Sequence, residues 1–520
     1  MNCNLYTTPS KDWKADVCIV LSCEGTQPLE KLQALKDVAP WVEISPALRD
    51  FQGKEEDLAL AYGHPEQNIP RLLCIGLGSI DKLKSELSPF DKFRKVIGTA
   101  IKKVQKLNLT SVAFCQDNLD EIAKLYGCDL SNIVEELVFS AKLALYKINI
   151  YTSKKDEDKE ITTLNIYLNS QQNYDNIKAA LRRGESSAEG VMFSRMLANG
   201  PANIVTPEYL ADQAESLAKK YNFKIEILEK DEIKDLKMGA FLAVAKAAKE
   251  KPRFIILEHC PKGTEDQTPI VYVGKGITFD TGGVSLKPAA KMHEMKADMG
   301  GAAAILGFFK TLGELSTSGT NEQVLKRRVI GVMPCTENMI GGKATRPGDV
   351  VTTCSGKTVE ILNTDAEGRL ILCDALTYAQ KRWNPEYIVD LATLTGACAI
   401  ALGEDIAGLF SNDVHFSHEL YQYGNKTGDY VWSMPLWGNY FESMKSDVAD
   451  MANIGSREGG AINAALFLKQ FLEFEGENAK LKWVHIDMAG PAYVLKKNSI
   501  LGGGASGFGV RLLLSIASNK

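Results

Sequence analysis

The sequence predicts an α/β protein of two domains: a smaller N-terminal α/β domain and a larger C-terminal α/β/α domain with a mostly parallel mixed sheet. Three observations support this prediction. The chain of 520 residues is too long for one ordinary domain. Apolar residues make up 45% of it and charged residues 24%, which is the balance of a folded globular protein. Short β-type runs alternate with helix-like stretches along most of the chain, as in sheets covered by helices.

The N-terminal domain is predicted over residues 1–180, followed by a linker helix over residues 181–200. The strand-like runs of this domain are Asp16–Ser22, Arg71–Gly76, Ser111–Phe114 and Thr163–Leu168. A helix-like stretch lies at Phe93–Leu107. From Asn176 to Leu197 the sequence becomes polar with a helical pattern, and Gly200-Pro201 then indicates the end of that helix.

The larger domain is predicted over residues 201–520. Thr206-Pro207 opens a helix, because proline at the first helical position has no N–H whose hydrogen bond could be lost. Further strand-like runs are Arg253–Leu257, Pro269–Val273, Arg328–Met333, Val359–Leu362, Tyr387–Leu391 and Trp483–Asp487. Helical segments separate most of them, which predicts a mostly parallel sheet with its functional site at the strand ends.

Composition argues against several classes of protein. The formal charge of −5 and the sequence pI of about 5.9 offer no basic face for phosphates, so nucleic-acid binding is disfavoured. The eleven cysteines are scattered and contain no C-x-x-C pair, which is typical of reduced thiols in a reducing compartment. No secretory signal is visible at the N-terminus, and no apolar run reaches the roughly 18 to 20 residues that span a bilayer. We therefore expect a soluble, cytoplasmic protein with no membrane span.

A metal site in this chain would have to be built mainly from carboxylates, because none of the six histidines lies in an H-E-x-x-H motif. Lys275 follows the apolar run Ile270–Val273, where a buried ammonium is costly unless it is paired or neutral. Two interpretations stay open. Lys275 is either a neutral amine ligand beside a divalent cation or the partner of Asp280 in a salt bridge.

Two more charged residues follow in the same segment. Asp298 directly precedes Met299–Ala304, the predicted start of a helix rich in small residues. It is either a metal ligand or a negative charge that complements the helix N-terminus. Lys287 precedes Pro288 in a predicted loop, where a solvent-exposed lysine is the usual case.

A second carboxylate-rich segment follows the predicted strand that ends at Leu362. Thr364 and Glu367 have the spacing of a capping box, so Glu367 alone could be a helix cap. A cap leaves Asp365 and Arg369 unexplained, and Gly368 weakens the helix that would be capped. Three carboxylates at the ends of neighbouring strands would repel one another unless a cation lay between them. Oxygen-rich sites with one nitrogen suit manganese, magnesium or zinc.

The run Asn363-Thr364-Asp365-Ala366-Glu367-Gly368-Arg369-Leu370 matches, over all eight residues, the signature of the leucyl aminopeptidase family of two-metal exopeptidases. The resemblance covers roughly residues 195–515, which implies that the larger domain is the catalytic one. Supporting matches are Asn203, Thr206-Pro207, Gly341-Gly342, Arg346-Pro347-Gly348-Asp349, Thr393-Leu394-Thr395-Gly396-Ala397, Gly459-Gly460-Ala461-Ile462 and Asp487-Met488-Ala489-Gly490.

The resemblance implies two divalent metal ions per subunit, zinc and/or manganese, with magnesium or cobalt as alternatives. Asp280 and Glu367 would bridge both ions. Lys275 and Asp298 would complete the tighter site, and Asp365 the more exchangeable one.

The resemblance also implies roles around the metals. Lys287 would polarise the scissile carbonyl and stabilise the oxyanion, while Arg369 would hold a bicarbonate ion that shuttles a proton. The residues implied for the first-residue pocket are Met295, Thr393, Leu394, Gly396 and Ala464.

The activity implied is removal of the first residue from peptides with a free N-terminus, with leucine and other aliphatic residues preferred. The subunits would assemble as a homohexamer. Two alternatives stay open: a catalytically inactive, family-like scaffold, and a peptidase with an additional DNA-binding regulatory role, as some relatives have. The acidic composition argues weakly against the second.

Overall fold

The structure is a computed structural model of the whole chain. It describes residues 1–25, 39–41, 45–79, 88, 90–148, 151–153, 159–317, 325–474, 480–494 and 500–518. The chain forms two compact units, one of Met1–Ala188 with Lys496–Gly502 and the other of Glu189–Leu495 with Gly503–Lys520. The predicted linker helix lies within helix α6 (Tyr174–Asn199), except for residue 200. The exact domain boundaries stay a prediction.

In the N-terminal unit, the described residues form a six-stranded sheet in the order β1-β6-β5-β2-β4-β3. Only the β3–β4 pairing is antiparallel. The strands are β1 Asn2–Tyr6, β2 Val17–Cys23, β3 Leu58–Tyr62, β4 Arg71–Gly78, β5 Ser111–Cys115 and β6 Thr163–Tyr167. The helices are η1 Ser10–Asp12, η3 Pro46–Leu48, α3 Phe90–Lys106, α4 Gln116–Tyr126 and α5 Leu130–Ala144. All four predicted strands are present, with ends shifted by one or two residues.

The centre of this sheet is buried on both faces. Val17, Ile19 and Leu21 on β2 pack into one core with residues of α3, α4 and α5, whereas Cys18 and Val20 pack into a second core on the other side. This alternation follows from the two-residue period of a strand. A strand buried on both faces reads as a continuous apolar run, which is why the sequence shows β2 so clearly.

The C-terminal unit is built on a nine-stranded sheet within the described residues, in the order β16-β15-β18-β14-β9-β11-β8-β7, with β10 paired to β11. The central pairings, from β18 to β10, are parallel, while β15–β18, β11–β8 and β8–β7 are antiparallel. The strands are β7 Lys224–Leu228, β8 Arg253–His259, β9 Ile270–Gly274, β10 Gly276–Asp280, β11 Val329–Asn338, β14 Tyr387–Ala392, β15 Ala407–Ser411, β16 Val431–Ser433 and β18 Lys482–Asp487. The predicted mixed, mostly parallel sheet is therefore present.

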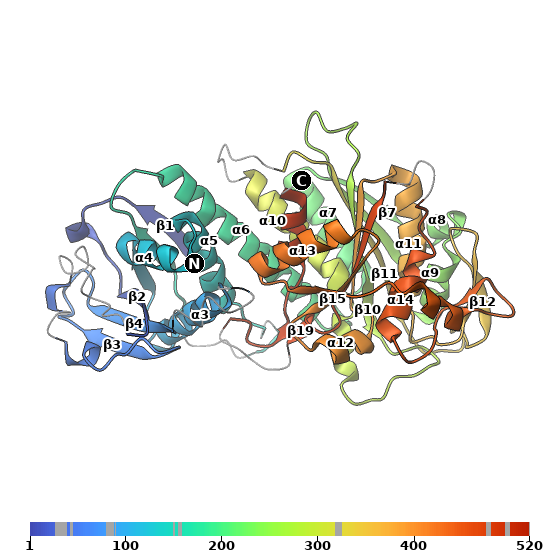
Figure 1. The fold of residues 1–520 in the computed structure, drawn as a ribbon, viewed down its shortest axis with the longest axis horizontal. Helices are drawn as coiled ribbons and strands as arrows, with labels where there is room; N and C mark the ends of the chain where they lie inside the picture. Colours follow the sequence, from blue (N-terminus) through green and yellow to red (C-terminus); the bar gives the residue numbers. More distant parts are fainter. Residues whose placement is uncertain are drawn as a thin grey trace. The chain divides into compact units, whose positions relative to one another are not determined.

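Helices cover both faces of this sheet, as the right-hand part of Figure 1 shows. One layer contains α7 Pro207–Tyr221, α10 Gly300–Thr317, α13 Val414–Thr427 and α15 Val510–Ser518, and the other contains α9 Gly239–Val244, α11 Gly368–Trp383 and α14 Gly460–Lys469. On β9, Tyr272 contacts Phe308 of α10, whereas Val271 and Val273 pack into the core beneath α11. Within the described part of the chain, no helix is both long enough and apolar enough to cross a bilayer.

Shorter elements connect these layers. The helices are α8 Lys230–Asp235, η4 Ala245–Ala247, η5 Met292–Ala297, α12 Gly396–Leu402 and η6 Gly438–Met444, and the strands are β12 Asp349–Thr352, β13 Thr358–Ile361, β17 Met451–Ala452, β19 Tyr493–Val494 and β20 Gly504–Ala505.

One predicted strand has a different place in the fold. The run Val359–Leu362 forms β13, but β13 belongs to a separate three-stranded sheet with β12 and β17. Its side chains alternate between buried and half-buried, with Thr358 and Glu360 on the half-buried face. A central strand of a covered parallel sheet is apolar on both faces, so β13 is too polar for that position.

The start of α10 lies unusually close to the central strands. Gly301 is so near to β14 and the end of β9 that a Cβ atom there would lie 2.1 Å from the Leu391 carbonyl oxygen and 2.7 Å from the Lys275 backbone nitrogen. The Ala302 N–H donates to the Lys275 carbonyl over 2.9 Å. Helix α10 is thereby fixed against the residue that follows β9.

We therefore predict that Gly301→Ala destabilises the C-terminal unit by about 1–3 kcal/mol, because the added methyl group overlaps backbone atoms that cannot rotate away. This is the net effect, because the steric overlap outweighs the roughly 1 kcal/mol by which alanine is favoured over glycine in a helix. Gly342→Ala is the matched control, since its Cβ would have no described atom within 4 Å beyond its chain neighbours. Denaturant unfolding should change by less than about 0.5 kcal/mol for the control. Equal stability of the two variants would contradict the close contact.

Candidate active site

Three buried carboxylates meet at one end of the C-terminal sheet. Asp280 is the last residue of β10, Asp298 lies between η5 and α10, and Glu367 directly precedes α11. One oxygen from each carboxylate lies within 4.8 Å of the others. The sequence predicted such a cluster at the ends of neighbouring strands. The structure brings the carboxylates together, but only Asp280 ends a strand, while the other two precede helices.

Two lysines lie against this cluster. The Lys275 Nζ atom is 2.8 Å from Asp298 Oδ2 and 2.7 Å from Glu367 Oε1. The Lys287 Nζ atom is 2.9 Å from Asp280 Oδ2 and also pairs with Asp365. Among the described residues Lys275 thus pairs with Asp298 and Glu367, and Asp280 pairs with Lys287, so the salt bridge between Lys275 and Asp280 that the sequence left open is not formed.

Burial strongly opposes the negative charges. It raises the pKa of Asp298 well above its usual range, and the carboxylates of Glu367 and Asp280 raise this pKa further, while Lys275 lowers it. Burial likewise raises the pKa of Asp280, with a further contribution from Glu367, and Lys287 and Lys275 oppose the shift. The cluster therefore needs positive charge beside it to stay ionised.

The pKa values of the two lysines are set by the same groups, but here burial lowers the pKa and the carboxylates raise it. Burial lowers the pKa of Lys275, but the carboxylates of Asp298, Glu367 and Asp280 outweigh burial and raise it overall. The pKa of Lys287 is raised by the same balance, with Asp280 as the largest opposing charge. In the absence of other cations, both lysines are therefore ammonium ions that neutralise the carboxylates.

The carboxylates have unused capacity to bind a cation. Glu367 Oε2 is buried and has neither a hydrogen bond nor an ion pair among the described residues. Within the described ranges, Asp298 Oδ2 and Asp365 Oδ1 have no well-oriented hydrogen bond, and each pairs with a lysine ammonium. Buried polar atoms without partners are rare and usually mark a bound water, ion or ligand. Several carboxylates with one amine nitrogen form a donor set that fits manganese, magnesium or zinc.

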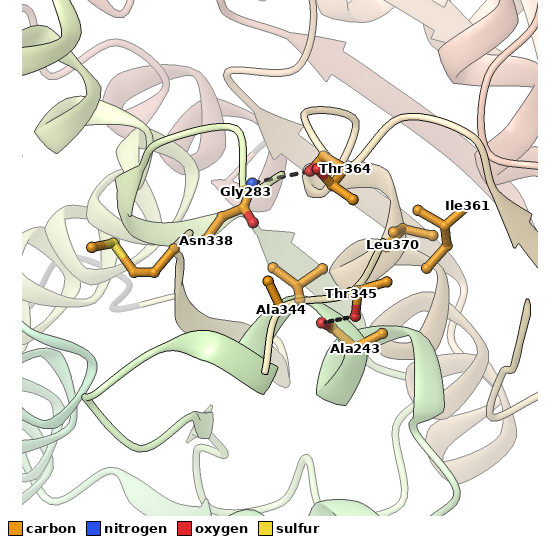
Figure 2. Close-up of a pocket in the computed structure, with 10 residues that line it drawn as sticks. Ala243, Gly283, Asn338, Ala344, Thr345, Ile361, Thr364 and Leu370 are labelled. Carbon is orange, nitrogen blue, oxygen red and sulfur yellow. Dashed lines mark hydrogen bonds between the residues drawn. The ribbon is translucent and has the colours of Figure 1, made fainter. Parts of the chain in front are cut away.

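Neutral polar groups behind the cluster hold its loops in place, and two of them, Asn338 and Thr364, line the neighbouring pocket drawn in Figure 2. Asn338, at the end of β11, donates through Nδ2 to Asp280 Oδ1 over 2.8 Å and to the Thr364 carbonyl over 3.0 Å. The Thr364 hydroxyl donates to the Gly282 carbonyl over 2.7 Å and accepts the Ser285 N–H over 2.8 Å. Asn338 was not predicted as a site residue, and its one signal in the sequence is that it is a polar residue at the end of a long buried run.

The capping-box interpretation of the second segment is wrong. Glu367 itself takes the N-cap position of α11, without a capping hydrogen bond from its side chain, and the Thr364 hydroxyl is engaged by the Gly282–Ser285 loop. The presence of glycine at position 368 is explained by close packing. A Cβ atom there would lie 2.6 Å from Lys275 Cε, so glycine leaves room for the lysine side chain.

A cavity of about 380 Å³ opens onto the cluster. All five proposed metal ligands and Lys287 line it, as do four residues predicted for the substrate pocket, Met295, Thr393, Leu394 and Gly396. Lining residues that the sequence analysis missed are Glu294, Ala297, Thr395, Ala399, Glu404, Ala489, Gly490, Ala492 and Tyr493. Ala464 is fully buried in α14 and is not part of this wall.

Arg369 is buried in the first turn of α11 and also lies off the cavity wall. Its Nη1 atom donates to the Asn453 carbonyl over 2.9 Å, while its buried Nε atom has no hydrogen-bond partner in the part of the chain that the structure describes. Burial lowers the pKa of Arg369 to about 10, although Glu367 and Asp487 oppose this shift. The guanidinium therefore has an unused donor close behind the acidic cluster.

Comparison with known proteins gives consistent matches over nearly the whole chain. The catalytic domain of the cytosol aminopeptidase family matches residues 192–514, and the N-terminal domain of that family matches residues 19–155. The chain is 48% identical over 508 residues to a probable cytosol aminopeptidase of Nitratidesulfovibrio vulgaris, covering 97% of this chain and 96% of the relative. It is 48% identical over 519 residues to another from Oleidesulfovibrio alaskensis, covering 99% and 98%.

Solved structures agree. A tomato leucine aminopeptidase mutant matches with a TM-score of 0.83 and 33% identity, over 100% of this chain and 97% of that one. The bottromycin maturation enzyme BotP in complex with Mn matches with a TM-score of 0.80 and 29% identity, over 97% and 99%. These matches confirm the resemblance found in the sequence and give no support to an additional DNA-binding role. The chain belongs to the cytosol aminopeptidase family and is a metal-dependent aminopeptidase.

Proposed function

We propose that this aminopeptidase prefers peptides that begin with leucine or another aliphatic residue. The observation that carries the proposal is the cluster of buried, incompletely paired carboxylates beside a cavity of about 380 Å³. That volume lies within the range of small-molecule sites and fits a single residue with its peptide bond. The cavity opens where the proposed catalytic lysine, Lys287, meets Asp280 and Asp365.

Within this proposal, Asp280 and Glu367 would be shared by two divalent cations, Lys275 and Asp298 would help to hold one of them, and Asp365 would help to hold the other. When bound, two such cations lower the pKa of a water molecule to near neutrality and polarise a carbonyl group. Zinc and manganese are the proposed ions, and the BotP structure, which holds Mn, supports manganese. Lys275 would bind through a neutral amine, because a metal ion replaces the charge that the ammonium now supplies.

Two further residues act on the substrate side of the reaction. Lys287 is only partly buried on the cavity wall and holds a positive charge, so it can donate a hydrogen bond to the scissile carbonyl as negative charge develops on its oxygen. Arg369, whose buried Nε–H has no hydrogen-bond partner among the residues described, would hold a bicarbonate ion, which supplies a weak base.

We further propose that the protein works in the cytoplasm as a homohexamer. The family name and the scattered cysteines, none of which forms a disulfide in the described structure, support the cytoplasm. Assembly would confine the active sites to a chamber that admits short peptides. Sedimentation of active protein should give a species about six times the 57.0 kDa chain mass. An active monomer would contradict the hexamer.

Paired variants separate the proposed metal ligands from the proposed oxyanion donor. Glu367→Ala should lose bound metal together with at least about nine-tenths of the activity, because it removes the bridging carboxylate. Lys287→Ala should keep its metal but lower kcat by roughly 10²–10³, since an oxyanion donor acts mainly in the transition state. Metal content and kcat are measured on the same samples. Parallel loss of metal and activity in Lys287→Ala would make that lysine a ligand or a structural residue.

The cavity wall also predicts substrate preference. Met295, Gly396 and Ala399 offer apolar or small surfaces, whereas Glu294 and Glu404 would repel an acidic side chain. Each buried methylene contributes about 0.8 kcal/mol, so leucyl amides should exceed alanyl amides roughly tenfold or more in kcat/KM. Glutamyl amides should be poor substrates.

An N-acetylated leucyl amide is the matched control for this series, because it differs from the best substrate only at the amine. It should not react, since the blocked amine can no longer bind at the cluster of carboxylates and cations. Measurable hydrolysis of the acetylated compound would contradict an exopeptidase site.

A further inference from the structure

We propose that Asp487 is a positioning residue that fixes both the metal-binding cluster and the first-residue pocket through the segment Thr393–Gly396. This inference rests on the proposed function and adds a residue to it. Asp487 belongs to the motif Asp487-Met488-Ala489-Gly490, to which neither the sequence analysis nor the proposed chemistry gives a role.

The Asp487 carboxylate lies at the end of β18, is fully buried, and accepts four hydrogen bonds. Its Oδ1 atom accepts the backbone N–H groups of Leu394 over 3.1 Å, Thr395 over 3.3 Å and Ala489 over 3.2 Å. Its Oδ2 atom accepts the Thr395 hydroxyl over 2.6 Å. One side chain thereby holds the loop that follows β14.

This loop contacts two of the proposed metal ligands directly. The Thr393 carbonyl accepts a hydrogen bond from Lys275 Nζ over 3.0 Å, and the Thr393 hydroxyl donates to Asp298 Oδ1 over 2.7 Å. Thr393 is therefore the link between the anchored loop and the cluster. A shift of its backbone would move the partners of both ligands at once.

The same loop forms part of the cavity wall. Leu394 and Gly396 line the cavity, and the Thr395 hydroxyl accepts the Cys398 N–H over 3.0 Å to begin α12. Residue Ala399 of α12 also lines the cavity. A single buried carboxylate thus sets the position of the cluster partners and of one pocket wall, which a purely local helix cap would not do.

A second buried carboxylate in the same unit provides a matched control. Asp374 in α11 is also fully buried and accepts backbone N–H groups, from Phe241 over 2.9 Å and from Cys354 over 2.6 Å. Neither of those two residues lines the cavity. Loss of Asp374 should therefore cost stability, as loss of Asp487 should, without moving the Thr393–Gly396 segment.

The experiment compares full-length Asp487→Asn and Asp374→Asn with the unchanged chain. Asparagine keeps the size of the side chain but presents an NH₂ donor where Thr395 or a backbone N–H needs an acceptor. Three quantities are measured on each protein: the thermal unfolding midpoint, retention of Mn²⁺ against a competing chelator, and kcat and KM for leucyl and alanyl amides.

We expect both substitutions to lower the unfolding midpoint. Only Asp487→Asn should weaken Mn²⁺ retention, by roughly 10–100-fold as for other residues that orient metal ligands. It should also raise KM for the leucyl amide and reduce the ratio of kcat/KM for the leucyl amide to kcat/KM for the alanyl amide. Retention and selectivity that are unchanged in Asp487→Asn, or changed equally in Asp374→Asn, would overturn the proposal.

Two further comparisons keep the test decisive. If Asp487→Asn does not fold, Thr395→Val serves instead, because it removes the hydroxyl contact with Asp487 Oδ2. Thr395→Ser keeps this contact and should restore both Mn²⁺ retention and the preference for leucyl over alanyl amides. Failure of serine to restore them would overturn the proposal. If the unchanged chain neither retains Mn²⁺ nor hydrolyses the leucyl amide, the proposed function fails instead, independently of Asp487.

Discussion

Three buried carboxylates lie within 4.8 Å of one another in the C-terminal unit, and the arrangement of the active site depends on offsetting their mutual repulsion when they are ionised. At an effective dielectric constant of about 20, each such pair of like charges costs at least about 3 kcal/mol, in addition to the cost of desolvation. Two lysine ammonium groups offset this repulsion in the structure, yet one Glu367 oxygen still has no partner among the described residues. Divalent cations would offset it more completely, which is why an acidic cluster of this kind and metal-dependent hydrolysis belong together.

The fold brings distant parts of the chain to this point through close backbone contacts. Gly301 lets α10 approach the end of β9, and Gly368 leaves room for the Lys275 side chain beside α11. Asn338 then connects the Asp280 loop to the Thr364 loop. Close backbone contacts and hydrogen bonds from neutral donors such as Asn338 therefore hold the loops of the cluster in addition to its ion pairs.

Much of the fold and of the site was predictable from the sequence, for identifiable reasons. Strands buried on both faces, such as β9, can be recognised as continuous apolar runs. The charged residues around Glu367 can be recognised from the eight-residue signature alone, before the fold is known. The sheet to which β13 belongs was not predictable, because strand pairing depends on distant segments. The same limit explains Ala464, which the structure buries inside α14, away from the cavity wall.

Local sequence rules also failed where tertiary contacts compete with them. Thr364 and Glu367 have capping-box spacing, yet the threonine hydroxyl bonds to another loop. The most direct test of the whole account is an anomalous-difference map from crystals of the full-length protein grown with Mn²⁺. Two peaks are expected among the carboxylates of Asp280, Asp298, Asp365 and Glu367, one of them also beside Lys275. No peak there, or peaks only elsewhere, would contradict it.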